Sequence, residues 1–224
     1  MVHPKKKKTS LLEFEEDIRL QGFQNIAGVD EVGRGCLAGP VVAACVLLPW
    51  WEVFEGVDDS KKLTSAQREK VFPVIIERAF AYGIGIVDAG DIDTMNIGRA
   101  TLKAMRMAVE SMQIRPDFLL VDGNRPITLM TIPQKPVIKG DSLSLSIAAA
   151  SIVAKVTRDK MMAALISQFP GFRFDIHKGY GTKKHWEELE RHGPTAIHRT
   201  SFKGVLRSSV FGLLKNRFTD FGFS

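Results

Sequence analysis

The chain has 224 residues, 45% of them hydrophobic and 25% charged, which fits one α/β domain with a sizeable core. Its formal net charge of +6 favours a polyanionic partner. No stretch is long and apolar enough to span a membrane and no secretory signal is present, so we expect a cytoplasmic protein. Cys36 and Cys45 suggest no disulfide framework, and we expect both to be small buried residues.

The first half of the chain predicts three strands and two helices after a lysine-rich tail, residues 1–20, which we expect to be disordered. The strands are expected at residues 26–31, 41–48 and 81–87, and the helices at 64–79 and 91–112. Because the turn between the first two strands is short, these strands should pair antiparallel. Thr64, followed three residues later by Gln67, is typical of a capping box at the start of the first helix.

The second half predicts two short strands and a long helix. The strands are expected at residues 118–121 and 136–139, and the helix at about 144–169. Residues 147–154 are nearly apolar all round, which indicates a central, buried helix. The last fifty residues predict short helices around a loop at 177–182. This order of elements favours an α/β fold, with a mixed sheet that has an antiparallel lip.

Four acidic residues lie where strands are expected to end. Asp30 and Glu31 close the first strand, and Asp122 and Asp141 follow the two short strands. Ligand sites in open α/β sheets lie beyond the carboxyl ends of strands. Taken singly, Asp122 fits an Asx-turn and Asp141 fits a helix cap. Taken together, carboxylates about 4 Å apart repel by roughly 4 kcal/mol per pair at an effective dielectric of 20, which favours a bound cation.

Oxygen ligands of this kind suit Mg²⁺ or Mn²⁺ better than zinc. Two such ions about 3.5–4 Å apart can cleave a phosphodiester, one by activating water and the other by stabilising the leaving oxygen. A glycine-flanked arginine, Gly33-Arg34-Gly35, follows the first two acids, and its glycines would let the backbone approach a polyanion closely. The alternative for this triplet is an ordinary hairpin turn. The five histidines show no spacing typical of zinc ligands.

Several segments together resemble the ribonuclease HII family, the type 2 ribonucleases H. In chain order they are GVDEVGRG at 28–35, LAGPVVAA at 37–44, DSKKL at 59–63, IDTMNIGRAT at 92–101, VDG at 121–123, KGDSLSLSIAAASIVAKVTRD at 139–159, HKGYGTKKH at 177–185 and HRTSF at 198–202. The GRG triplet is similar to that of the bacterial branch. The resemblance implies a ribonuclease H-like catalytic domain over residues 21–170 and a small helical C-terminal part over 171–224.

The resemblance also implies an activity, that of an endonuclease with the classification EC 3.1.26.4. Such an enzyme cuts the RNA strand of RNA–DNA hybrids and nicks duplex DNA 5′ to single ribonucleotides, leaving 3′-hydroxyl and 5′-phosphate ends. Hybrids and ribonucleotide-containing duplexes are the expected partners, two divalent ions (Mn²⁺ or Mg²⁺) the expected cofactors, and a monomer the expected state. The family's catalytic, metal-binding carboxylates fall on Asp30, Glu31, Asp122 and Asp141.

The resemblance places recognition of the ribonucleotide on Gly33, Arg34, Gly35 and Tyr180. The 2′-hydroxyl that distinguishes RNA from DNA both donates and accepts hydrogen bonds. The backbone groups of glycines and the phenol of a tyrosine can pair with it in both ways. The alternative for Tyr180 is an amphipathic loop anchor. Phosphate contacts are expected at Ser60, Lys61, Lys62, Asn96, Ser151 and Lys155.

Two of these expectations have alternatives within the chain. The lysine pair at 61–62 also fits a solvated face, and Lys155 fits an i,i+4 ion pair with Asp159. Asp159 lies eighteen residues after Asp141, about 27 Å along an unbroken helix, so we expect it to be structural.

Three rival classes of protein fit the sequence less well. Ribonuclease HIII normally carries an extra N-terminal domain and a GTG triplet, whereas this chain has about 25 residues before its first strand and Arg34 in the triplet. Another nuclease or recombinase of the same fold would lack the triplet and the Tyr180 loop. A module that binds hybrids without cutting them would have lost a carboxylate, and all four are present.

Overall fold

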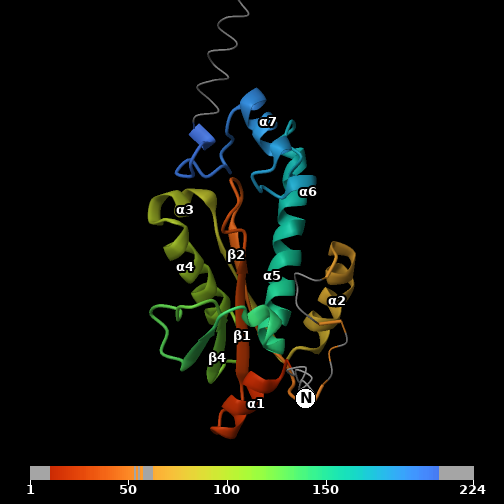
Figure 1. The fold of residues 1–224 in the computed structure, drawn as a ribbon, viewed down its shortest axis with the longest axis vertical. Helices are drawn as coiled ribbons and strands as arrows, with labels where there is room; N and C mark the ends of the chain where they lie inside the picture. Colours follow the sequence, from red (N-terminus) through yellow and green to blue (C-terminus); the bar gives the residue numbers. More distant parts are fainter. Residues whose placement is uncertain (1–10, 53, 55, 58–62, 207–224) are drawn as a thin grey trace, which may run out of the picture.

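The computed structural model describes residues 11–52, 54, 56–57 and 63–206. Within them the core is a mixed five-stranded sheet in the order β3-β2-β1-β4-β5 (Figure 1). The strands are β1 Ile26–Val32, β2 Val41–Leu47, β3 Ala81–Val87, β4 Phe118–Asp122 and β5 Gln134–Val137. β2 pairs antiparallel with β1 and β3, whereas β4 pairs parallel with β1 and β5. The expected mixed sheet with an antiparallel lip is therefore confirmed.

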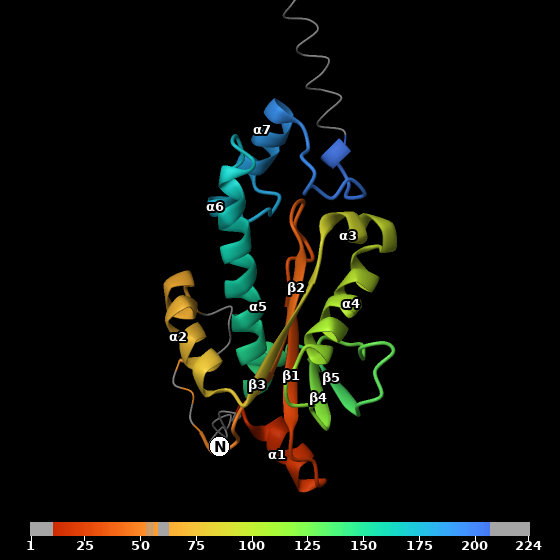
Figure 2. The same ribbon diagram turned by 180° about the vertical axis from the view of Figure 1, so that it is seen from behind.

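Helices cover both faces of the sheet (Figures 1 and 2). The described helices are α1 Glu13–Leu20, α2 Ser65–Arg78, α3 Ala89–Met95, α4 Ile97–Glu110, α5 Leu145–Ala164, α6 Phe174–His177 and α7 Lys183–His192, with 3₁₀ turns at Gly140–Ser142 and Leu165–Ser167. Side chains of β2 alternate between the two faces, so Ala43 and Cys45 pack in the core under α4, and Ala44 and Val46 in the core under α5. None of the described helices is long and apolar enough to cross a membrane.

Helix α5 lies directly against the middle of the sheet, as its apolar sequence predicts. The helix packs on β1 at Gly28, where a Cβ would collide with the backbone of Ser146 and Ile147. Glycine therefore lets the two backbones approach each other more closely than any side chain would allow. This contact brings the first half of α5 beside the carboxyl end of β1, where the first two acids lie.

The segment expected to end a disordered tail forms α1 instead. Phe14 and Ile18, one helical turn apart, pack against the sheet in a cluster of buried apolar residues. Glu15 is buried between them and accepts hydrogen bonds from the hydroxyls of Ser144 and Ser146 at 2.6 and 2.7 Å. The tertiary contacts of this short apolar stripe order the segment. The lysine-rich residues 1–10 lie outside the described residues.

The single helix expected over residues 91–112 is two helices, α3 and α4, that meet at Asn96. Asn96 has a φ of 71°, and its side chain accepts a hydrogen bond from the Arg99 N–H at 3.1 Å, which caps α4. The periodic apolar pattern continues across this break and hides it. The long helix also ends sooner than expected, at Ala164. The last strand lies at 134–137 rather than 136–139, because Lys139, with a φ of 57°, already belongs to the turn before α5.

Candidate active site

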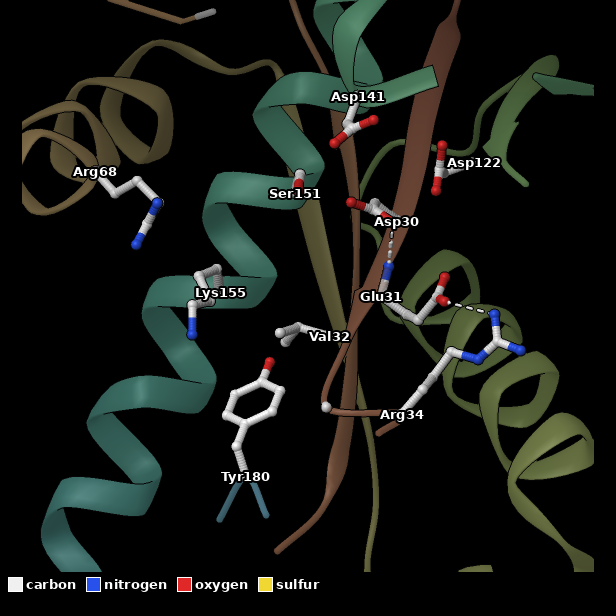
Figure 3. A pocket seen from close by; sticks show the side chains of 11 residues that line it. Asp30, Glu31, Val32, Arg34, Arg68, Asp122, Asp141, Ser151, Lys155 and Tyr180 are labelled. Carbon is white, nitrogen blue, oxygen red and sulfur yellow. Dashed lines mark hydrogen bonds and ion pairs between the residues drawn. The ribbon is translucent and has the colours of Figure 1, made fainter. Parts of the chain in front are cut away.

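The four acids line a single pocket beside the sheet (Figure 3). Asp30 and Glu31 belong to β1, Asp122 is the last residue of β4, and Asp141 lies in the 3₁₀ turn before α5. β1 and β4 are parallel neighbours, so their carboxyl ends lie side by side. The carboxylate of Asp122 accepts a hydrogen bond from the N–H of Gly140 at 2.7 Å, which joins the end of β4 to the turn. Three distant segments thus meet at one place.

Asp30 and Glu31 are adjacent in the strand and point in different directions (Figure 3). Asp30 is buried, and its carboxylate accepts a hydrogen bond from the Glu31 N–H at 2.7 Å. Glu31 turns toward Arg34, whose guanidinium donates to it at 3.2 Å. As the side chains stand, no group of three or more His, Cys, Asp or Glu residues in the described part of the chain forms a ready metal-binding cluster.

The electrostatics of the pocket oppose ionisation of Asp30 and Glu31. Burial raises the pKa of Asp30 well above its usual value, and the charges of Glu31 and Asp122 raise it further, against a hydrogen bond with Ser151. Burial also raises the pKa of Glu31, although Arg34 partly opposes the shift. A bound cation favours the charged form of a neighbouring carboxylate. The pocket therefore concentrates negative charge that a cation would stabilise.

The GRG triplet lies at the rim of the same pocket. Gly33 has a φ of 95°, and a Cβ there would strike the side chain of Arg158 and the carbonyl of Pro40, so the turn requires glycine. At Gly35 a Cβ would meet nothing within 4 Å. Packing therefore does not explain the second glycine, whose open backbone is free to approach a ligand.

Tyr180 faces the triplet across the pocket (Figure 3), and the residue is 37% exposed. The ammonium of Lys155 lies 5.4 Å from the ring centroid. Burial, followed by the neighbouring Cys36, raises the pKa of Tyr180 to about 12. The phenol therefore keeps its proton at neutral pH and can donate as well as accept a hydrogen bond.

The residues expected to contact phosphate divide between two adjoining pockets. Ser151 and Lys155 line the carboxylate pocket, whereas Asn96 lines the second pocket, which shares Glu31, Arg34 and Asp122 with the first. The volumes of about 360 and 530 Å³ lie within the usual range for ligand pockets, about 300–1,000 Å³. The other three expected contacts, residues 60–62, lie outside the described residues.

Lys155 also forms the alternative ion pair that the sequence predicted. Its ammonium lies 2.8 Å from the carboxylate of Asp159, one turn further along α5. Asp159 is absent from the described lining of the carboxylate pocket, in agreement with the structural role expected for it.

Among the lining residues that sequence reasoning missed, four have charged or amide side chains. Arg68 of α2 lines the carboxylate pocket, and Arg99, Asn124 and Arg125 line the adjoining one. Arg99 lies inside one of the motifs that resemble the family, and Asn124 and Arg125 follow Asp122 after a single glycine, so their positions beside the predicted site could have indicated these three residues. No local pattern marks Arg68, because packing of α2 on α5 brings it to the site.

Comparison with known proteins agrees with this architecture. The ribonuclease HII family profile matches residues 27–205. Ribonuclease HII of Geotalea uraniireducens (strain Rf4) is 54% identical over 202 residues, which cover 90% of this chain and 93% of that protein. The crystal structure of ribonuclease H2 from Pyrococcus horikoshii OT3 superposes with a TM-score of 0.71 at 26% identity, covering 88% of this chain and 99% of that one.

A more distant structure shows a likeness of fold alone. Bst-RNase HIII in complex with Mn²⁺ superposes with a TM-score of 0.65 at 17% identity, covering 85% of this chain and 71% of that one.

The mixed sheet, the acids at its strand ends and these similarities define the protein as a metal-dependent endonuclease with a ribonuclease H-like fold. More narrowly, the chain belongs to the ribonuclease HII family and cleaves the RNA of RNA–DNA hybrids. The rival assignments to ribonuclease HIII and to a non-cutting binding module are thereby set aside.

Proposed function

We propose that Asp30, Glu31, Asp122 and Asp141 hold two divalent ions, Mg²⁺ or Mn²⁺. We further propose that the enzyme cuts on the 5′ side of a ribonucleotide, both in hybrids and at single ribonucleotides in duplex DNA, leaving 3′-hydroxyl and 5′-phosphate ends. The observation that carries this proposal is the meeting of four carboxylates from three segments in one pocket. When bound, the ions supply an activated water and stabilisation of the leaving oxygen.

The donor set fits hard cations. The acids of the pocket offer only oxygen, and its described lining contains no cysteine or histidine. The raised pKa values of Asp30 and Glu31 are those expected of carboxylates that lack a full counter-charge. Bst-RNase HIII, which shares the fold, binds Mn²⁺.

The groups around the acids supply recognition. The open backbone at Gly35 approaches the 2′-hydroxyl, and the protonated phenol of Tyr180 bonds the same hydroxyl while its ring packs on the sugar. Lys155 attracts the phosphate beside the cut from its place on α5, and Ser151 orients Asp30. Recognition of the ribose thus takes place at one rim of the same pocket in which the strand is cut.

The adjoining pocket extends this site along the nucleic acid. Its polar lining includes Asn96, Arg99, Asn124 and Arg125, which bring two positive charges and two amides beside the acids. Arginine and asparagine are common ligands of backbone phosphates, and such contacts position the nucleic acid without reading its bases. We assign this pocket to the strand that flanks the ribonucleotide.

A duplex DNA with a single ribonucleotide tests the proposal. The enzyme should nick it 5′ to the ribonucleotide with Mg²⁺ or Mn²⁺ and not with EDTA. Asp122→Asn should abolish the cut and leave binding of the duplex largely intact. Asp17→Asn, at an exposed acid on α1, is the matched control and should cut normally. Cutting at another position, or full activity of Asp122→Asn, would refute the proposal.

A further inference from the structure

Two arginines lie buried behind the turn that carries Gly33-Arg34-Gly35, rather than in the pocket. The side chains of Arg158 on α5 and Arg199 near the C-terminal end of the described chain are fully buried. Burying a charged group is costly unless hydrogen bonds satisfy it. Every hydrogen bond that the structure gives these guanidiniums, within its described residues, ends on a backbone carbonyl. The two buried guanidiniums therefore serve to fix the backbone whose carbonyls they bind.

Arg199 holds the recognition triplet itself. Its Nη1 donates to the carbonyl of Arg34 at 2.9 Å, and its Nε and Nη2 donate to the carbonyl of Gly39 at 3.0 and 2.8 Å. The peptide that follows the Arg34 carbonyl carries the N–H of Gly35. One planar guanidinium thus fixes both ends of the turn that bears the open glycine, a task that its rigid fork of donors suits.

Arg158 joins that turn to the loop of Tyr180. Its Nε and Nη2 donate to the carbonyls of Pro40 and Ala38 at 2.9 and 3.0 Å, and its Nη1 donates to the carbonyl of Lys178 at 2.8 Å. The two loops also bond directly, because the Leu37 N–H donates to the carbonyl of Gly179 at 2.8 Å. The parts that would contact the 2′-hydroxyl from two sides are therefore one connected unit.

The segment that carries Arg199 is anchored in turn to α3. The carboxylate of Asp93 accepts hydrogen bonds from the backbone N–H groups of Thr200 and Ser201 at 2.8 and 3.0 Å, and from both hydroxyls. Burial alone would raise the pKa of Asp93, but the bonds from Ser201 and Thr200 outweigh it and lower the pKa. This exposed carboxylate offers a way to loosen Arg199 without touching the buried guanidinium.

We propose that Arg199, supported by Arg158, is a positioning residue that sets the enzyme's preference for a ribonucleotide over a deoxyribonucleotide. It fixes the Arg34–Gly35 peptide where that peptide meets the 2′-hydroxyl. The inference rests on the proposed function of this turn. A lysine in the same place keeps the charge but presents a single nitrogen, which cannot hold the Arg34 and Gly39 carbonyls with the same geometry.

The experiment measures binding of two duplexes in EDTA, where no cut occurs. One duplex is DNA with a single ribonucleotide, and the other has the same sequence in DNA throughout. The ratio of their two dissociation constants should fall about tenfold in Arg199→Lys, which corresponds to ~1.4 kcal/mol. The matched control is Arg173→Lys, an exposed arginine paired with Asp175, in which the ratio should stay at its wild-type value.

Loss of folded protein alone would leave this ratio unchanged, because inactive molecules bind neither duplex. An Arg199→Lys ratio equal to that of the wild type would therefore overturn the positioning role. If that variant does not fold, Asp93→Asn decides, with a smaller fall in the ratio in favour and an unchanged ratio against. A wild-type protein that binds both duplexes equally would refute the proposed recognition by the turn, and the inference with it.

Discussion

The carboxylate pocket and the region behind Tyr180 are both polar, but they differ in how their charges are balanced. In the pocket, Asp30 and Glu31 have raised pKa values, because burial and neighbouring acids disfavour their charged forms. Behind Tyr180 lies a histidine cluster, which we define as His177, His185 and His198, and there the hydrogen bonds of the rings are complete. The carboxylate pocket keeps negative charge that a ligand can balance, whereas the histidine cluster supports the Tyr180 loop that faces the pocket.

Each nitrogen of the histidine cluster has a partner. The Thr195 N–H donates to Nδ1 of His198 at 2.9 Å, so that nitrogen carries no proton. Nε2 of His198 then donates to Nε2 of His185 at 3.0 Å, and Nδ1 of His185 donates to the carbonyl of Tyr180 at 2.9 Å. The chain of bonds has one direction and requires both histidines to be neutral.

His177 continues the cluster toward a buried acid. Its ring stacks on that of His185 with centroids 4.1 Å apart, and its Nδ1 accepts from the Gly179 N–H at 3.1 Å. The other nitrogen therefore donates to Glu188 at 2.8 Å. Burial is the main cause that lowers the pKa values of all three histidines, to about 4 in His185 and about 3 in His198.

The largest effect should follow from neutralising an acid of the pocket. Asp141→Asn should lower kcat/KM for a hybrid substrate by at least ~10³-fold, a loss of ~4 kcal/mol of transition-state stabilisation, because one oxygen ligand of the proposed ions is weakened. Steady-state cleavage in Mn²⁺ measures it. A loss of less than tenfold would remove Asp141 from the metal site.

Breaking the histidine chain should affect stability more than chemistry. His185→Ala leaves the Tyr180 carbonyl and Nε2 of His198 without their partner, which costs about 1–3 kcal/mol per buried unsatisfied group. Urea unfolding measures the loss. The control is His192→Ala, at an exposed histidine on the same helix, which should change the free energy of unfolding by less than about 0.5 kcal/mol. Equal stability of the two variants would deny the cluster a structural role.

The histidine cluster also predicts an acid-sensitive fold. An unfolded histidine binds a proton below a pKa of about 6.5, whereas His185 and His198 stay neutral in the fold down to about pH 4 and 3. Between those limits the unfolded chain binds more protons, so the free energy of unfolding should fall as the pH drops from 6.5 toward 4. Thermal unfolding of wild type and His185→Ala across this window tests it, and the variant should show the weaker dependence on pH.

The smallest effect should come from the hydroxyl of Tyr180. Tyr180→Phe keeps the ring beside Lys155 and removes only the phenol, so cleavage at a single ribonucleotide should fall by about tenfold, the effect of one hydrogen bond. Tyr180→Ala should fall further, because it also removes the surface that packs on the sugar. Equal cleavage rates for Tyr180→Phe and wild type would exclude a role for the hydroxyl and leave packing of the ring as the contribution of Tyr180.

Local patterns predicted the elements well where a strong local cause exists. The short turn after β1 requires an antiparallel partner, and Thr64 and Gln67 form the capping box that their spacing predicts. The break at Asn96 was missed, because one residue with a positive φ does not interrupt the periodic pattern of apolar residues. Helix α1 was missed because tertiary contacts of Phe14 and Ile18, rather than composition, order it.

The residues of the site could be predicted from the sequence, but their arrangement in space could not. Strand ends and motif order pointed to Asp30 and Asp122, but the parallel pairing of β1 with β4 that brings them together is a property of the whole sheet. Packing between distant elements brings Arg68 to the pocket and Arg158 and Arg199 to the turn behind it, and such packing leaves no periodic trace in the sequence.

The most direct test of the contrast between the two regions is the stability of Asp30→Asn in EDTA as a function of pH. Because Asp30 is buried among acids, its charged form opposes folding, and the opposition grows as the pH rises above its unfolded pKa of 3.8. We expect a variant that is inactive yet more stable than the wild type at pH 7, with a difference in stability that vanishes toward pH 4. A variant less stable than the wild type at pH 7, or a difference that does not depend on pH, would contradict this expectation.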